Sequence, residues 1–112
     1  MTHTRPALRE PTYFILASLI DGPLHGYGII KQAEQLSGGR VRLAAGTLYG
    51  ALDRLMADGL VEEQGREVVD GRERRYYALT DAGHGVVAEE ARRMAASSQA
   101  VLVRLDAVRG MA

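Results

Sequence analysis

The stretch AGTLYGALDRLMADGL, residues 45–60, predicts one short helix with two different faces. Leu48, Leu52 and Leu55 recur at helical spacing and form an apolar stripe that would face a core. The opposite face carries small or hydrogen-bonding residues, namely Thr47, Gly50, Asp53, Arg54 and Ala57, with Tyr49 beside them. Because little on this face would hold it away from another surface, we interpret it as a recognition helix that enters the major groove of DNA.

Both ends of this helix carry local signals. At its start, Thr47 is expected to accept a hydrogen bond from a free backbone N–H, and Gly46 allows a tight turn. At its end, Gly59 is expected in the left-handed conformation, with Leu60 folding back on Leu55. We expect the remaining elements of the chain to position this helix.

Composition indicates one domain with an appended element, since the 112 residues contain no cysteine and one continuous pattern of apolar segments. There is no secretory signal pattern and no apolar run long enough to span a bilayer, so we expect a soluble cytoplasmic protein without membrane contact. The formal net charge is zero, with 14 basic and 14 acidic residues. Because DNA-binding domains are usually basic, DNA binding would have to depend on where the charges lie.

Two helices are expected before the recognition helix. Residues 1–10 lack periodicity and predict a flexible arm with Arg5 and Arg9 exposed. Pro11 suits the first position of a helix, whose apolar face is Phe14, Ile15, Leu16, Leu19 and Ile20. A second helix opens near His25, and its inward residues are expected to be Ile29, Ile30, Ala33 and Leu36. Residues 40–43 alternate polar and apolar side chains and indicate a short strand or an extended connector.

A β-hairpin is expected after the recognition helix, because the period changes from helical to two. Residues 60–69 and 72–79 have the pattern of strands, and Asp70-Gly71 between them is a strong hairpin signal. A two-residue turn predicts the pairs Val69–Arg72, Glu67–Arg74 and Arg66–Arg75. The last pair is repulsive unless an anion lies near it or both side chains splay into water. Three helices and then a hairpin predict a mainly α fold, a winged helix-turn-helix with a small β-hairpin wing.

A long last helix is expected from Thr80, with a capping hydroxyl and Asp81 in its first turn. Residues spaced four and three apart then form a seam of about three heptads: Val87, Ala91, Met94, Ser98, Val101, Leu105 and Val108. A helix to about Arg109 would be roughly 45 Å long, more than such a small domain can cover. We therefore expect a homodimer, with residues 1–79 as the DNA-binding domain and residues 80–112 as the dimerisation helix. A helix folded back on its own domain is the alternative.

Several motifs, taken in order, resemble the PadR family of bacterial transcriptional regulators. They are GPLHGY at residues 22–27; GTLY at 46–49 with Leu52, Arg54-Leu55 and Gly59-Leu60-Val61; and Arg74, Tyr76-Tyr77, Leu79-Thr80 and Gly83. The likeness runs from about Pro11 to the start of the last helix. The chain departs from well-known drug-binding members in having no tryptophan, and it carries Gly50 where many members have proline.

This resemblance implies a homodimeric repressor that binds a palindromic operator, of the short form with a single C-terminal dimerisation helix. It also implies a small aromatic or drug-like effector, for which we expect Tyr13, Phe14 and Met94 as lining residues. DNA contacts are predicted for Tyr27, Lys31, Gly46, Thr47, Tyr49, Gly50, Arg54, Arg72, Arg74 and Arg75. Alternatively, Tyr27 and Tyr49 are packing residues and Arg54 pairs with Asp58.

An enzymatic role is not expected. His3, His25 and His84 lie on different elements without the spacing of a metal site, and His25 is expected to be a packed or capping residue. No cofactor or metal is predicted. Two alternatives to DNA binding remain: a winged-helix module that binds protein, which the neutral charge favours, and a small-molecule carrier that uses the dimer cleft.

Overall fold

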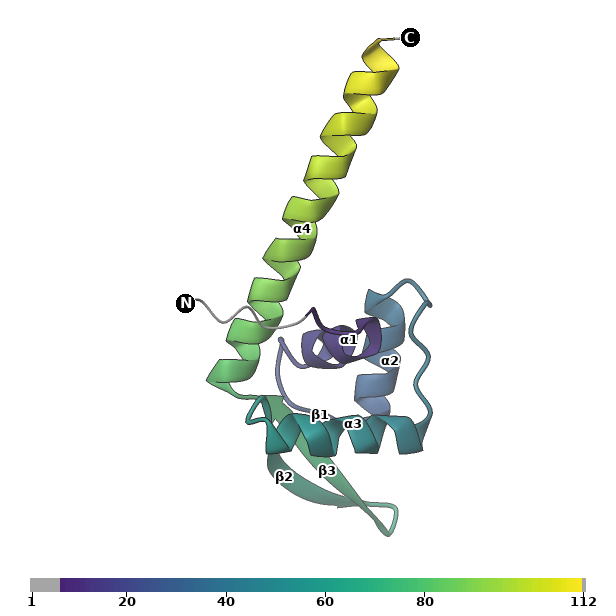
Figure 1. Ribbon diagram of the computed structural model, residues 1–112. Helices are drawn as coiled ribbons and strands as arrows, with labels where there is room; N and C mark the ends of the chain where they lie inside the picture. The colour runs from purple at the N-terminus through teal and green to yellow at the C-terminus, as the bar shows by residue number, and fades with distance from the viewer. Residues whose placement is uncertain (1–6, 112) are drawn as a thin grey trace.

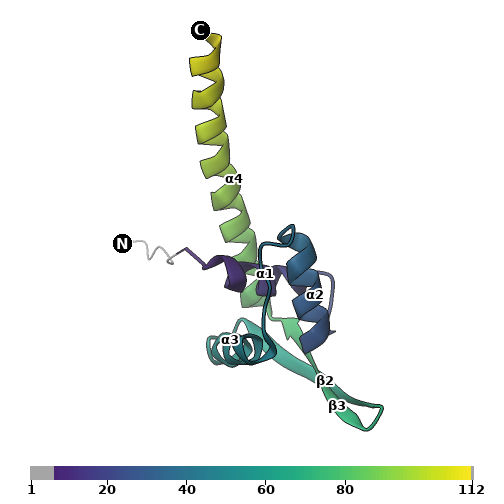
Figure 2. The same cartoon turned by 90° about the vertical axis from the view of Figure 1, so that its right-hand side faces the viewer.

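The computed structural model describes residues 7–111 and consists of four helices and a small antiparallel sheet (Figure 1). The helices are α1 (Glu10–Ser18), α2 (Gly26–Leu36), α3 (Ala45–Ala57) and α4 (Asp81–Gly110). The strands are β1 (Leu24–His25), β2 (Val61–Val69) and β3 (Arg72–Leu79), in the order β1-β3-β2. This is the predicted mainly α winged helix-turn-helix, and α4 projects from it as a long rod (Figure 2). No helix within the described range is long and apolar enough to cross a membrane.

One hydrophobic core lies where α1, α2 and α3 meet the sheet and the start of α4. Its fully buried side chains include Leu16, Ile29, Leu48, Leu52 and Tyr77. The leucine stripe of α3 therefore faces the core, as predicted. Ile20 and Leu36, which the pattern also places inward, are instead 49% and 47% exposed. Each lies at the end of its helix or just beyond it, past the turns that pack on the core.

The first described residues are anchored to the domain. The sequence predicts a flexible arm through Glu10, but Leu8 packs against the core and its N–H donates to Oε2 of Glu90 over 3.1 Å. Helix α1 then begins at Glu10. Local sequence gives no sign of this anchor because its acceptor lies 82 positions away. Residues 1–6 of the predicted arm, including Arg5, lie outside the described residues.

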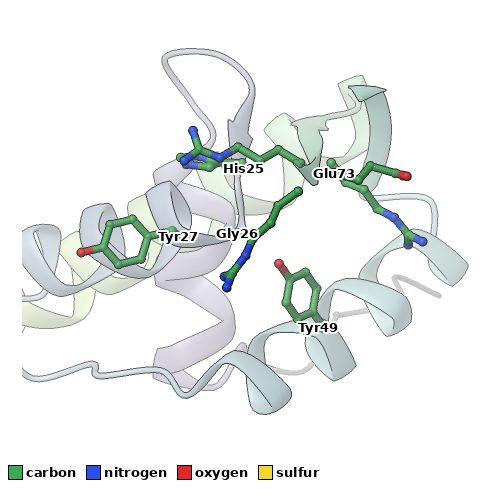
Figure 3. A pocket seen from close by; sticks show the side chains of 8 residues that line it. His25, Gly26, Tyr27, Tyr49 and Glu73 are labelled. Atoms are coloured by element: carbon green, nitrogen blue, oxygen red, sulfur yellow. The ribbon is translucent and has the colours of Figure 1, made fainter. Parts of the chain in front are cut away.

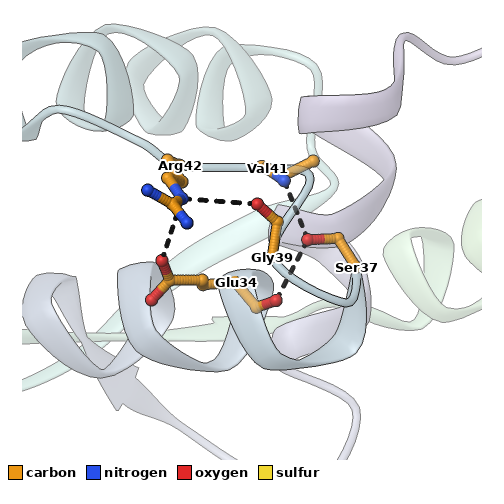
Figure 4. Close-up of polar contacts among 5 residues, drawn as sticks. All are labelled: Glu34, Ser37, Gly39, Val41 and Arg42. Carbon is orange, nitrogen blue, oxygen red and sulfur yellow. Dashed lines mark hydrogen bonds and ion pairs between the residues drawn. The ribbon is translucent and has the colours of Figure 1, made fainter.

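Polar contacts hold the connector between α2 and α3, which is extended and is not a strand (Figure 4). The hydroxyl of Ser37 donates to the carbonyl of Glu34 over 3.1 Å and accepts the N–H of Val41 over 2.8 Å. The guanidinium of Arg42 contacts the carbonyl of Gly39 and the carboxylate of Glu34, each at 3.4 Å. Since Ser37 and Val41 are buried, these bonds help to fix the path by which α3 follows α2.

The hairpin has the predicted register, with the pairs Val69–Arg72, Glu67–Arg74 and Arg66–Arg75. Asp70 and Gly71 form its turn, with φ of 52° and 75°, the positive values that a two-residue turn of this kind requires. The pairing shifts between Glu63 and Gly65. That irregularity was not visible in the alternation of the sequence.

Strand β1 is an addition to the predicted hairpin. Its two residues, Leu24 and His25, pair with Tyr77 and Tyr76 of β3. Two residues are too few to show a strand period, so the sequence could not indicate it. Because β1 is so short, residues 72–75 of β3 pair with β2 on one side and have no neighbouring strand on the other side within the described chain. We call this side the free edge of β3.

The end of α3 and the start of α4 are bonded to each other. Gly59 has φ of 74°, and the N–H of Leu60 donates to the carbonyl of Leu55 over 2.9 Å, as predicted for this helix end. Thr80 caps α4 by accepting the N–H of Gly83 over 3.0 Å, also as predicted. The same hydroxyl donates to the carbonyl of Gly59 over 2.6 Å, which links the two helices.

The cap predicted at the start of α3 is wrong. The residue before the helix is Ala44, which has no capping side chain, and its carbonyl accepts the N–H of Leu48 over 3.0 Å. The connector ends at Ala44 and the backbone is helical from Ala45, so the helix begins two residues before Thr47. Thr47 therefore lies exposed in the first turn of the helix.

Helix α4 has a packed first third and a projecting remainder. Gly83, Val87 and Glu90 are buried against the domain, whereas residues 91–110 are exposed. A β carbon on Gly83 would overlap the carbonyl oxygen of Leu60, so only glycine permits this approach. Val87 is 4% exposed and belongs to the core of its own chain. It is therefore removed from the dimer seam predicted for it, because it already has an intramolecular partner.

Candidate nucleic-acid interface

The face of α3 opposite the core is accessible. The predicted contact residues on it are Gly46, Thr47, Tyr49 and Arg54, which are exposed, and Gly50, which is half-buried. Among the described residues, Arg54 does not form the alternative ion pair with Asp58. Its Nη1 lies 3.7 Å from the position of a β carbon on Gly50, so the guanidinium extends along the helix surface.

A hollow of about 450 Å³ lies beside this helix, between the first turn of α2 and the free edge of β3 (Figure 3). Its lining residues are His25, Gly26, Tyr27, Tyr49, Arg72, Glu73, Arg74 and Arg75. The structure thus brings together Tyr27, Tyr49 and the three wing arginines, which come from three separate segments. The other predicted contact residues, Lys31, Gly46, Thr47, Gly50 and Arg54, do not line the hollow.

Two glycines of the GPLHGYG segment make room for rings at this hollow. A β carbon on Gly26 would lie 2.5 Å from the hydroxyl oxygen of Tyr49, and one on Gly28 would lie 3.0 Å from Nδ1 of His25. Tyr49 is 46% exposed, and its hydroxyl points toward the hollow (Figure 3). Tyr49 therefore packs on α2 and also lines the hollow, so the packing expected of it does not remove it from the proposed interface.

A series of ring contacts connects α2 to the hairpin. Nζ of Lys31 lies 5.6 Å from the ring centroid of Tyr27, a cation–π distance. The rings of Tyr27 and His25 meet edge-on, with their centroids 6.5 Å apart, and the ring of His25 stacks on that of Tyr76, with a centroid distance of 5.7 Å. The hydroxyl of Tyr76 donates to Glu67 over 2.8 Å, and this bond to a carboxylate raises the pKa of the phenol. Because Tyr27 is 65% exposed, its ring supports Lys31 at the surface and does not fill the core.

Some arginines are paired with acids and others are not. Away from the hollow, three of them form ion pairs: Arg40 with Glu10 at 3.0 Å, Arg42 with Glu34 at 3.4 Å and Arg93 with Glu90 at 2.7 Å. In the described part of the chain, no ion pair involves Lys31, Arg54, Arg72, Arg74 or Arg75. The cationic side chains predicted to contact DNA are therefore available to bind an anion from another molecule.

Arg66 neutralises the acid that lines the hollow. Its guanidinium binds Glu63 at 2.6 Å and Glu73 at 2.8 Å. The hydrogen bond to Glu63, followed by the charges of both carboxylates, raises the pKa of Arg66. The repulsion predicted between Arg66 and Arg75 is thereby relieved within the protein, without an external anion.

The predicted dimer residues other than Val87 lie on the projecting part of α4, residues 91–110. They are Ala91, Met94, Ser98, Val101, Leu105 and Val108, all exposed. Leu102, which the heptad pattern leaves out, is 53% exposed and lines an apolar hollow with Ser97, Ser98 and Val101. The predicted effector residues are not gathered in this way. The ring centroids of Tyr13 and Phe14 lie 5.1 Å apart in an edge-to-face contact, but neither these residues nor Met94 line any of the four best-formed hollows on the described residues.

Sequence reasoning missed how His25 and Glu73 contribute to the hollow. Of the two roles expected for His25, the structure shows packing: its ring stacks on Tyr76, and its side chain makes no capping bond to α2. From the sequence, Glu73 is a candidate for neutralising Arg72, Arg74 or Arg75; among the described residues it pairs instead with Arg66 across the hairpin, and these three arginines keep no acidic partner. The only sequence signal for this pair is the hairpin register, which puts the two residues two rungs apart and so on the same face of the hairpin.

Comparisons with known proteins agree with this architecture. The profile of the family described as "Transcriptional regulator PadR-like family" matches residues 15–89. Transcriptional regulator Rv3488 of Mycobacterium tuberculosis is 40% identical over 88 residues, which cover 79% of this chain and 78% of that protein. A 37.1 kDa protein of transposon TN4556 from Streptomyces fradiae is 48% identical over 84 residues, but these cover 72% of this chain and only 22% of that protein.

A solved structure shares the fold. PadR of Bacillus subtilis, in complex with operator DNA, aligns with a TM-score of 0.63 and 26% sequence identity. The alignment covers 72% of this chain and 46% of that one. The chain thus spans less than a quarter of the Streptomyces relative and less than half of the Bacillus protein.

Proposed function

The chain belongs to the PadR-like family of transcriptional regulators, and from that membership we propose that it binds double-stranded DNA as a homodimer. The hollow beside α3 carries this proposal, because three arginines converge there without acidic partners among residues 7–111. A polymer with regularly spaced phosphates is the partner that such a surface fits.

The contacts divide by chemistry. Helix α3 enters the major groove, where the exposed hydroxyl of Thr47 can reach a base edge or a phosphate. At the hollow, the hydroxyl of Tyr49 contacts the phosphate backbone of the DNA. Lys31, together with Arg72 and Arg74, binds flanking phosphates from α2 and from the free edge of β3. These contacts would fix the orientation of the protein on the duplex.

A second copy of the chain is the proposed partner of α4. Met94, Val101, Leu105 and Val108 are between 40% and 67% exposed, and the two halves of a symmetric dimer would cover the same stripe on each other. Removing apolar surface from water favours association by about 25 cal/mol for each Å², before the entropy lost on association is subtracted. We assign residues 1–79 to DNA binding and residues 80–112 to dimerisation, with the contact starting near Ala91 because Val87 is internal.

We further propose that the protein acts as a repressor and that an effector releases it from DNA, and the way in which α3 and α4 are joined supports this. The bond from Thr80 to Gly59 couples the start of α4 to the end of α3, so the dimer helices would set the distance between the two copies of α3. A palindromic operator with half-sites about one helical turn apart suits that arrangement. An effector bound between α1 and α4 would release DNA if it bound one arrangement of the dimer more tightly than the other. Tyr13, Phe14 and Met94 line none of the hollows described above, so the dimer would have to bring them together.

Selection of bound genomic fragments tests the proposal. The fragments should share an inverted repeat and lie at promoters, and binding to one of them should weaken steeply as salt rises. In a reporter assay, a repressor lowers expression from that promoter. Absent or salt-insensitive binding would contradict the proposal and favour a protein-binding winged helix. A ligand retained without effect on DNA binding would instead indicate a small-molecule carrier.

A further inference from the structure

The outermost line of α3 is almost bare of side chains. Gly46, Gly50, Asp53 and Ala57 follow one another at spacings of four, three and four residues, which places them along one stripe of the helix. The buried side chains Leu48, Ala51, Leu52 and Leu55 lie on the other side. We call the four outer residues the outer line of α3. A helix with such a line can approach a base edge closely, since three of its residues end at the α or β carbon.

Asp53 is the one residue of the outer line with a polar side chain. It is exposed, and within residues 7–111 its carboxylate takes part in no ion pair and no hydrogen bond. The neighbouring Arg54 extends toward Gly50 and does not neutralise it. An acid at the centre of a DNA-facing helix is repelled by phosphates, so it lowers affinity for DNA in general. At such a position a carboxylate can favour binding only where it meets a hydrogen-bond donor, and only some base sequences offer one in the major groove.

We propose that Asp53 determines specificity, by accepting a hydrogen bond from the N4 amino group of a cytosine in the major groove. This inference rests on the proposed function. An ionised carboxylate only accepts hydrogen bonds, and the donors in the major groove are the amino groups of cytosine and adenine. Adenine places the acceptor N7 beside its amino group, which would repel a carboxylate; cytosine has no acceptor there. Thymine and guanine present acceptors, so Asp53 also rejects them.

Selection from randomised duplexes, run in parallel for the protein and its variants, tests this inference. For the unaltered protein, one position of each half-site should require a C·G pair, and replacing it by T·A should weaken binding at least about fivefold. Asp53→Ala should lose that preference while binding other DNA more tightly. Asp53→Asn should change the preferred base to adenine, because an amide can pair with both N6 and N7. Alanine is a better helix former than aspartate, so Asp53→Ala is expected to fold.

Asp58→Ala is the matched control. It removes the same charge from the end of the same helix, at an exposed position off the outer line. The control should leave every base preference unchanged. If Asp53→Ala and Asp58→Ala change affinity for all sequences alike and leave the preferences intact, the inference is wrong although DNA binding stands. If the unaltered protein selects no sequence, the proposed function itself fails.

Discussion

The hydroxyl oxygen of Tyr49 lies directly over the backbone of Gly26, so close that a β carbon on Gly26 would be only 2.5 Å from it. This contact joins the first turn of α3 to the first turn of α2. It also positions the same hydroxyl at the arginine-lined hollow. Packing between the two helices and the proposed phosphate contact therefore depend on one ring.

Gly26→Ala should displace that ring. Overpacking typically costs about 1–3 kcal/mol, whereas replacing glycine by alanine in a helix returns up to about 1 kcal/mol, so a net loss of stability is expected. The midpoint of urea unfolding should fall to a lower urea concentration, and affinity for DNA should decrease. Adding Tyr49→Phe should restore part of the stability, because the next ring atom is 3.0 Å from the new methyl. Equal losses with and without Tyr49→Phe would show that the clash is not with this hydroxyl.

Val101→Glu should separate the proposed dimer. Val101 lies in the seam of α4 and is 57% exposed, so in the monomer the new charge would stay in water, whereas in the dimer it would be buried at the interface. Sedimentation velocity should give a monomer at concentrations where the unaltered protein is dimeric. Val103→Glu makes the same change two residues further along, at a position 55% exposed but outside the seam, and should leave the dimer intact. Equal behaviour of the two variants would contradict the seam.

Arg74→Ala should weaken DNA binding for all sequences alike. Each phosphate contact that is lost should lower the slope of log affinity against log salt by about one. Fluorescence anisotropy over a salt series measures that slope. Arg92→Ala removes the same charge from an exposed position on α4 and should leave the slope unchanged. If the slope stays the same in both variants, Arg74 does not contact a phosphate.

Glu90 should stabilise the fold at neutral pH and lose this effect in acid. Its carboxylate binds Arg93 and accepts the N–H of Leu8, and the hydrogen bonds from Arg93 hold the pKa of Glu90 below its ordinary value of 4.5. When folding lowers the pKa of a carboxyl, the ionised group stabilises the folded state at pH values above the pKa of the unfolded state. This stabilisation is lost as the pH falls through the lower pKa of the folded state. Glu90→Gln should therefore unfold more easily than the unaltered protein at pH 7, and the difference should shrink below about pH 4.5.

Chemical denaturation at several pH values, at one protein concentration, measures this difference. Glu89→Gln alters an exposed neighbour on the same helix and should show a small difference that does not change with pH. A difference for Glu90→Gln that persists at pH 3 would indicate that the carboxylate charge is not what holds Leu8 in place.

Local signals in the sequence were sufficient for most of the fold. The left-handed Gly59, the bond from Leu60 to Leu55, the Thr80 cap and the Asp70-Gly71 turn all form as predicted. Each depends on residues only a few positions apart, so its geometry follows from backbone preferences and short-range hydrogen bonds. The hairpin register follows from the turn in the same way, and it already paired Glu67 with Arg74.

Tertiary structure determined which residues far apart in the sequence contact one another. It buried Val87 in the core of its own chain, tied Leu8 to Glu90, paired β1 with β3 and started α3 before Thr47. It also brought Tyr49, Gly26 and the wing arginines to one hollow, with Glu73 neutralised by Arg66. These outcomes depend on which surfaces meet when the chain packs. No period or spacing within one segment carries that information, because the partner of each residue lies on another element.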